Sequence, residues 1–296
     1  MPAALKFGRL PGVVPVGLRD LTYYSAGPLP APPPSVAVPP VADWGMDGND
    51  NWGDCGVAAL QHGFMGAAAD VHQGESFPSD QQVVDYYLKY TGGEDSGVVL
   101  SQFLAYARRA GYYGHTVQAY APVAVHDVPT LQFAINAYDF AYVGINVTEG
   151  MMDAVQGDGP WTWTAADLTG ETVGGHCIIL AGYDSEWLYG VTWGSTIRIA
   201  YPAWHQMSDE AWALIVGEEV KAGTDGHGLN LAALQADLSQ LAKPIPPQPA
   251  PQPPAPPAPP QPDPLLQQLV ALIREVAQAE QKGLQEITQW LAKHGL

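Results

Sequence analysis

The sequence predicts an α+β fold of two lobes, a helical lobe followed by an antiparallel sheet. Two observations lead to this prediction. Apolar residues recur at helical spacing in segments between about 55 and 137, and apolar runs typical of buried strands follow between about 141 and 216. Helices that precede strands, rather than alternate with them, indicate two separate layers of secondary structure. A cleft between such lobes would bring distant parts of the chain together.

Four helices are expected in the first lobe. The alanine-rich segment over about 55–70 suits helix formation and close packing. The second helix begins after Ser79, an N-cap residue whose capping-box partner is Gln82. The other two are expected over about 99–110 and 128–137.

The second lobe is expected to be a sheet. The segment 141–147 is apolar enough to be a buried strand. Further strands are expected over about 175–183, 186–193 and 196–199, and the segment 211–216 would close the sheet.

A cysteine and a distant histidine are the candidate chemical groups. Cys55 stands at the start of the first helix, where unpaired backbone N–H groups and the helix dipole stabilise a thiolate. We therefore expect its pKa to lie below the ordinary value. His176 opens an apolar strand later in the chain. One cysteine with a histidine on a later strand is the pattern of a Cys/His hydrolase.

Three motifs resemble those of papain-like cysteine peptidases. Gly53-Asp54-Cys55-Gly56 resembles the nucleophile segment, and Gly175-His176-Cys177 with its apolar continuation resembles the histidine strand. Val191-Thr192-Trp193-Gly194 resembles the Asn-Ser-Trp-Gly element of that family. The motifs occur in the family's order, and the resemblance covers about residues 40–217. The stretch 44–55 also resembles proteins of actinobacteria and their phages that share a Gly-Asn-Asp…Gly-Asp-Cys signature.

The resemblance implies a papain-like two-lobe fold with Cys55 as nucleophile and His176 as base. Asn49 holds the position of the family's glutamine, which donates to the oxyanion together with the Cys55 backbone N–H. Asn51 is the competing amide for that role.

The position of the family's orienting asparagine is occupied by Val191, which cannot accept a hydrogen bond from the imidazole. Asp184 would replace it if its loop folds back. Trp52 and Trp193 are expected either to line the cleft or to belong to an aromatic core. A papain-like scaffold kept for binding or structure is the alternative to an active pair.

The chain divides into five segments on composition. We expect an extended Pro-rich N-terminal arm over 1–40, a papain-like domain over 41–226, a short helix over 227–243, a Pro-rich linker over 244–264 and an amphipathic helix over 265–296. The arm carries Leu18, Leu21, Tyr23 and Tyr24, which favour docking over free movement.

The amphipathic helix over 265–296 has no core of its own to bury its apolar stripe. It should therefore associate with copies of itself as a dimer or trimer, dock on another structural protein, or fold back on its own domain.

Composition limits the partners. The chain of 296 residues has 12 Lys and Arg against 30 Asp and Glu, a formal charge of −18. Such a surface repels phosphate backbones, so nucleic acid is not expected as a partner. No segment has the length of a membrane span or of a signal-peptide core, so we expect no membrane partner and synthesis in the cytoplasm. Both Cys55 and Cys177 are expected to be free thiols.

Metal sites and cofactors are not expected. No pair of His or Cys has zinc spacing, and no Gly-rich phosphate loop is present. Asp47 to Asn51 hint at a calcium loop, but the glutamate that completes such a loop is missing, because Ala58 stands at that position.

Three functions remain in competition. The first is a thiol hydrolase acting on a peptide or isopeptide. The second is a structural, decoration or minor tail protein of a phage particle, with a degenerate papain-like module oligomerised by its C-terminal helix. The third is a cell-wall lysis peptidase, although no basic wall-binding module is recognisable.

Overall fold

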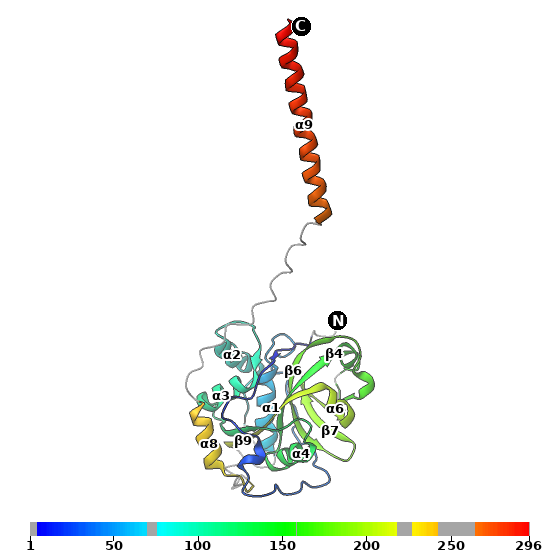
Figure 1. Cartoon of the computed structure of the whole chain (residues 1–296). Coiled ribbons are helices and arrows are strands. Elements are labelled where there is room, and N and C mark those ends of the chain that lie inside the picture. Colours follow the sequence, from blue (N-terminus) through cyan, green and yellow to red (C-terminus); the bar gives the residue numbers. More distant parts are fainter. Residues whose placement is uncertain (1–4, 70–75, 158, 218–226, 242–263, 296) are drawn as a thin grey trace. The chain divides into compact units, whose positions relative to one another are not determined.

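The computed structural model describes residues 5–69, 76–157, 159–217, 227–241 and 264–295. The chain forms two compact units, Met1–Ile245 and Pro246–Leu296. The first unit has the α+β fold expected from the sequence, in which helices pack against a largely antiparallel sheet (Figure 1).

The predicted helices of the first lobe are confirmed. They are α1 (Cys55–Ala69), α2 (Asp80–Thr91), α3 (Leu100–Ala110) and α4 (Val128–Ala137). The capping box of Ser79 and Gln82 is present at the start of α2. Two short helices were not predicted, α5 (Glu149–Asp153) and α6 (Tyr201–Met207).

The sheet has the strand order β3-β9-β4-β6-β7-β8-β5. The strands are β3 (Val117–Pro122), β4 (Ala141–Thr148), β5 (Trp161–Trp163), β6 (Thr172–Tyr183), β7 (Trp187–Thr192), β8 (Ser195–Ala200) and β9 (Ser208–Val216). All neighbours are antiparallel except β5 and β8. The five predicted strands correspond to β4 and β6–β9, whereas β3 and β5 were not predicted.

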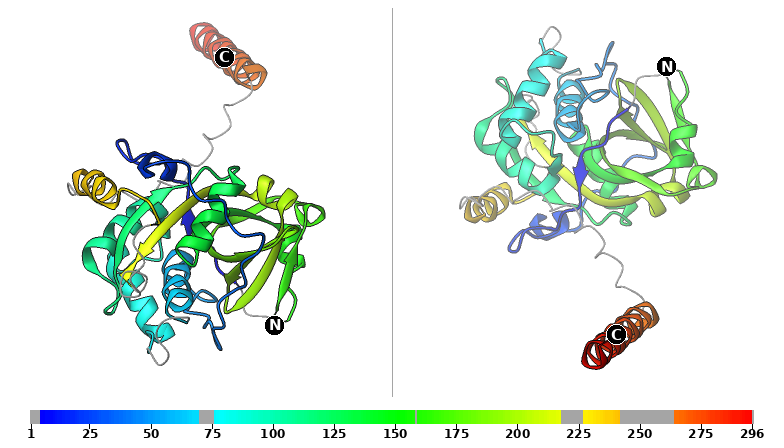
Figure 2. Two further views of the ribbon diagram at one scale, coloured as in Figure 1. Left: turned by 90° about the horizontal axis from the view of Figure 1, so that it is seen from below. Right: turned by 90° about the horizontal axis from the view of Figure 1, so that it is seen from above.

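Helix α1 lies between the sheet and helices α2 and α3 (Figure 2). Small residues allow this close packing. A Cβ atom on Gly63 would overlap the Phe140 ring, and one on Gly56 would lie 3.0 Å from the Tyr142 hydroxyl. Helix α1 is almost entirely buried, and it packs directly against strand β6.

The N-terminal arm docks on the first unit, as its apolar residues predicted. Leu18, Leu21 and Tyr24 are buried, whereas Tyr23 is exposed. The 3-10 helix η1 (Leu21–Tyr24) contacts α8 (Leu231–Gln240), and the Tyr24 hydroxyl donates to Asp237 at 2.9 Å. The arm and α8 therefore belong to the same compact unit as the papain-like domain expected over 41–226.

Earlier in the arm, the short strand β1 (Arg9–Leu10) pairs in parallel with β2 (Val98–Val99). This pairing directs the arm across the region where α1 begins, because Gly8 lies against the backbone of Gly53.

The second unit contains the long helix α9 (Pro264–His294), which confirms the helix predicted near the C-terminus. Most of the Pro-rich linker expected over 244–264 lies outside the described residues. Apolar side chains of α9 are exposed, among them Leu284, Ile287 and Trp290. Within the described ranges, no helix is long and apolar enough to cross a membrane.

Candidate active site

Cys55 is the first residue of α1, and the preceding carbonyl of Asp54 accepts from the amides of Val57 and Ala58. Its side chain is only 1% exposed. Burial raises the pKa of the thiol to about 12, although the backbone amides of Cys177 and Gly8 hydrogen-bond to the sulfur. The expected lowering of this pKa by the helix N-terminus was therefore wrong for this state of the protein. Desolvation of a thiolate outweighs the two amides and the dipole.

His176 lies in β6, beside the backbone amide that contacts the Cys55 sulfur. The backbone of the residue that follows His176 therefore lies against the Cys55 sulfur. The imidazole is fully buried, and its Nδ1 atom has no hydrogen-bond partner among the described residues. Burial, and then the charge of Arg9, lower the pKa of His176 to about 3. Both groups are therefore neutral at pH 7.

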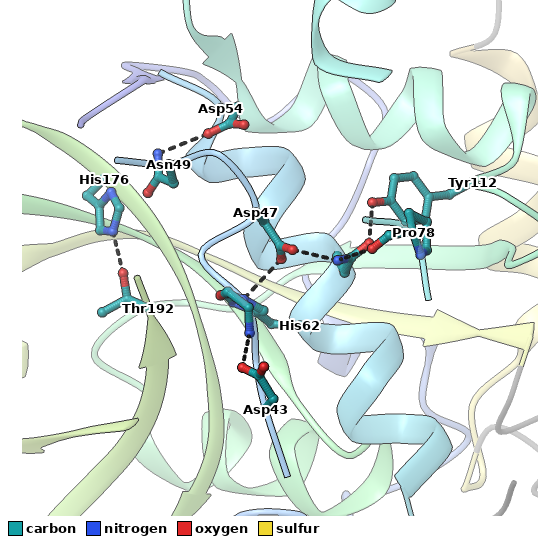
Figure 3. Close-up of polar contacts among 11 residues, drawn as sticks. Asp43, Asp47, Asn49, Asp54, His62, Pro78, Tyr112, His176 and Thr192 are labelled. Carbon is teal, nitrogen blue, oxygen red and sulfur yellow. Dashed lines mark hydrogen bonds and ion pairs between the residues drawn. The ribbon is translucent and has the colours of Figure 1, made fainter. Parts of the chain in front are cut away.

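Thr192 makes the contact that orients the imidazole. Its Oγ1 atom lies 2.6 Å from Nε2 of His176 (Figure 3). In the tautomer with the proton on Nε2, the Nε2–H donates a hydrogen bond to this hydroxyl, and Nδ1 keeps its lone pair for a thiol. Side chains alternate along a strand, so Val191 points into the core while Thr192 faces the histidine.

The expectation that Asp184 would orient the imidazole was wrong. That carboxylate accepts from the Tyr189 hydroxyl at 2.6 Å and from the amides of Glu186 and Trp187 at 2.8 Å. It therefore stabilises the turn between β6 and β7, and Thr192 takes the position beside the imidazole.

Trp193 stacks on His176, with ring centroids 4.2 Å apart. Trp193 and Gly194 form the two-residue turn between β7 and β8, and both have positive φ, 46° and 72°. A bulky residue in this conformation is strained, so the surrounding packing must hold it there. The indole covers one face of the imidazole, and it is also buried in the hydrophobic core, the second of the two expected alternatives. Trp52 is half-buried in the loop before Cys55.

Asn49 does not have a free donor for an oxyanion. Its Nδ2 atom donates to Asp54 Oδ1 at 3.1 Å (Figure 3). The same atom also donates to the Trp52 carbonyl at 3.0 Å. The predicted oxyanion role of Asn49 is therefore not supported by this geometry, and the side chain instead holds a buried carboxyl next to Cys55. Burial raises the pKa of Asp54 to about 8. Asn51, the competing amide, is exposed.

The N-terminal arm covers the site. The Phe7 ring lies edge-on to His176 at 5.8 Å between centroids, and the Lys6 carbonyl accepts from the Trp193 indole at 3.4 Å. The Gly8 carbonyl accepts from Val98 at 2.7 Å. The apolar residues of the arm predicted that it docks, but nothing in the sequence predicted that it docks over this site. The sequence Phe7-Gly8-Arg9, which contains one of the chain's 12 Lys and Arg residues, was the only available signal for this contact.

A second buried polar cluster lies behind the nucleophile loop. Asp47 pairs with His62 at 3.1 Å and accepts from Gln61 at 2.6 Å. Tyr112 donates to Gln61 at 2.7 Å. Asp47, the first aspartate of the loop that resembles a calcium-binding sequence, is therefore bound by side chains of the protein itself. Across the described ranges, no group of three or more His, Cys, Asp or Glu is arranged to hold a metal ion.

Cys177 is a free, buried thiol, and so is Cys55, as the sequence predicted. The two cysteines therefore do not form a disulfide. Cys177 interacts with the Tyr142 hydroxyl, which donates to the Gly56 carbonyl at 2.8 Å and thereby connects the start of α1 to β4.

Solved structures share this architecture. Xylellain, a cysteine protease from Xylella fastidiosa, aligns with a TM-score of 0.54 at 15% identity over 72% of this chain and 96% of its own. The fold is papain-like. Procathepsin L 3 from Tenebrio molitor gives a TM-score of 0.49 at 15% identity over 72% of this chain and 76% of its own. A cysteine protease from Carica candamarcensis gives 0.44 at 16% identity over 62% and 98%. No family model and no curated protein sequence matches the chain.

Proposed function

We propose that this chain is a thiol hydrolase of peptide or isopeptide bonds that uses Cys55 and His176, and that its N-terminal arm keeps it latent. The observation that supports the proposal is the contact of the Cys55 sulfur with the Cys177 amide, one residue after His176 in β6, beneath an arm whose Gly8 also reaches the sulfur and whose Phe7 lies against His176. The papain-like fold supports the same reaction class.

The chemistry follows from the two side chains. His176 takes the thiol proton on Nδ1, and the Cys55 sulfur attacks the acyl carbon. The tetrahedral oxyanion is stabilised by the Cys55 backbone N–H, which lies in the first turn of α1 and lacks an intrahelical acceptor. His176 then protonates the leaving amine, and water releases the acyl group by the same path.

The arm opposes this chemistry in two ways. The Gly8 N–H lies against the Cys55 sulfur. The arm therefore occupies the position of a substrate carbonyl carbon without offering one for attack. It also excludes water and adds the charge of Arg9, and both effects favour the neutral imidazole. When the arm leaves, the thiol and imidazole become hydrated, and their pKa values move back toward the ordinary ones.

Gly8 provides the experiment. A Cβ atom there would overlap the Gly53 carbonyl, so Gly8→Ala should displace the arm in the full chain. We expect iodoacetamide to label Cys55 in this variant at least tenfold faster than in the wild type. Gly27→Ala is the matched control, because Gly27 lies in the same arm with no atom within 4 Å of its added Cβ.

The catalytic pair is tested in the same variant. Adding His176→Ala to Gly8→Ala should slow the labelling of Cys55 near pH 6.5, because the base is lost. Equal labelling rates with and without the imidazole would contradict the proposal and favour a scaffold without activity.

The structural-protein hypothesis keeps one specific observation in its favour. Helix α9 exposes several large apolar side chains in a unit separate from the papain-like one. This feature is typical of an oligomerisation or docking helix, and it is compatible with either an active or an inactive first unit. Incorporation into a phage particle remains part of this second proposal.

A further inference from the structure

Arg9 occupies a polar pocket next to the candidate nucleophile. The side chain is 2% exposed, although an arginine is seldom buried without partners. Its Nη2 atom donates to Asp209 and to the Asn146 side-chain oxygen, both at 2.8 Å. Nη1 lies 3.7 Å from the Glu210 carboxylate. The pocket therefore surrounds one guanidinium with two carboxylates and an amide.

The pocket is part of the papain-like sheet. Asn146 belongs to β4, and Asp209 and Glu210 belong to the neighbouring strand β9. The Asn146 amide donates to Asp209 at 2.9 Å, and the Trp212 indole donates to Glu210 at 2.8 Å. The acidic groups are thus held in place by residues that belong to the domain itself.

Two glycines leave room for the occupant. A Cβ atom on Gly144 would lie 2.7 Å from Cδ of Arg9, and one on Gly175 would overlap the Arg9 carbonyl. Beyond the two carboxylates the surface continues into a cavity of about 340 Å³ that is lined in part by Val13 and Trp212. The room beside the two glycines is filled by the extended Arg9 side chain.

The pocket lies next to the reacting sulfur. Gly8 contacts Cys55, and Arg9 is the next residue along the chain. A peptide that replaces the arm on this surface would place a side chain in the same pocket within about two residues of the bond attacked, because neighbouring Cα atoms are about 3.8 Å apart. An apolar side chain there would leave two partly desolvated carboxylates without a neutralising cation, which costs more than a missing contact.

We infer that the pocket formed by Asn146, Asp209 and Glu210 is a specificity pocket that selects an arginine or lysine side chain of the substrate next to the cleaved bond. This inference rests on the proposed hydrolase function and names its substrate class. Arg9 of the arm fills the same pocket in the latent protein, so the arm and the substrate compete for it.

The test uses the full chain carrying Gly8→Ala, with tripeptidyl chloromethyl ketones as probes of Cys55. Arginine or norleucine is placed at the first or at the second residue before the ketone. We expect arginine to accelerate alkylation roughly 10- to 100-fold over norleucine at one of these positions. Asp209→Asn with Glu210→Gln should remove the difference in rate between arginine and norleucine. Glu186→Gln, an exposed carboxylate on the turn between β6 and β7, is the matched control.

The outcomes separate the two proposals. If no peptide alkylates Cys55 in a His176-dependent manner, the hydrolase function is wrong. If alkylation depends on His176 but arginine and norleucine react equally at both positions, only the specificity pocket is wrong. Asp209→Asn alone, at a carboxylate that is 40% exposed, serves if the double variant does not fold.

A readout independent of catalysis is available in the arm. With Gly8 intact, Arg9→Lys should keep the arm amides protected from hydrogen exchange, whereas Arg9→Leu should expose them. Equal protection in the two variants would overturn the selection of a cation by this pocket.

Discussion

At the residue scale, Thr192 gives the clearest prediction. Thr192→Val removes the hydroxyl that lies 2.6 Å from the His176 ring and keeps the side-chain volume. We expect alkylation of Cys55 in the Gly8→Ala background to fall about tenfold, the effect of one lost hydrogen bond. Thr192→Ser should retain most of the rate. Thr172→Val, at an exposed position at the start of β6, is the control and should leave the rate unchanged.

Asn49 is predicted to stabilise the fold. Asn49→Ala removes both side-chain donors to the nucleophile loop, and one of their acceptors is the buried Asp54 carboxyl. The free energy of unfolding should fall by about 1–3 kcal/mol, the cost of leaving buried polar groups without partners. Denaturant unfolding measures this change. Asn51→Ala, at an exposed neighbour, should change stability by less than about 0.5 kcal/mol. Unchanged stability in Asn49→Ala with a loss of activity would restore the oxyanion role.

The sequence predicted the candidate pair at this scale but not its surroundings. Cys55 and His176 are recognisable because a nucleophile and a base must be specific residue types with helix and strand patterns beside them. Thr192 was missed because the sequence does not show which of the neighbours Val191 and Thr192 faces the histidine. That depends on the register of the strands in the folded sheet. The raised pKa of Cys55 was missed because burial under the arm depends on a contact between distant segments.

At the scale of elements, long periodic segments were predicted well. Helix α1 was expected over about 55–70 and spans Cys55–Ala69. Strand β5 has three residues, too few to show a period, and β3 ends at Pro122. Helix α6 begins with Tyr201 and Pro202, where proline favours the first helical turn but also resembles a loop.

The arm is the element with a predicted pH response. His176 has a pKa of about 3 beneath the arm and an ordinary value of 6.5. Between these two values the open form binds a proton that the closed form excludes. Falling pH through 6.5 should therefore weaken the closed form, by up to about 1.4 kcal/mol for each pH unit.

Hydrogen exchange of the arm amides, corrected for the intrinsic effect of pH, measures this response. We expect greater arm opening at pH 4.5 than at pH 7.5 in the wild type. Burial raises the pKa of Glu210, which acts in the opposite direction. The His176→Gln variant removes the imidazole. The increase in arm opening from pH 7.5 to pH 4.5 should therefore be smaller in this variant than in the wild type. An unchanged difference in that variant would exclude His176 as the titrating group.

At the scale of the whole molecule, charge and the C-terminal helix set the expected association. The formal charge of −18 makes identical chains repel one another at close range. Helix α9 has 31 residues, about 46 Å at ~1.5 Å per residue, and it exposes Leu284, Ile287 and Leu291. Apolar side chains in such a row favour association between helices. We therefore expect the full chain to be a dimer or trimer held by α9.

Light scattering on full-length variants tests this expectation. Ile287→Glu with Leu291→Glu should give a monomer, because a carboxylate at a helix interface opposes burial. Gln278→Glu adds a charge at another exposed position of α9 and should keep the wild-type multiplicity. Gly283→Ala should strengthen the assembly by about 1 kcal/mol per chain through helix propensity, since nothing lies within 4 Å of the added Cβ. If the glutamate variants and a chain ending at Lys243 keep the wild-type multiplicity, self-association resides elsewhere, and the apolar row of α9 is instead a surface for a different protein.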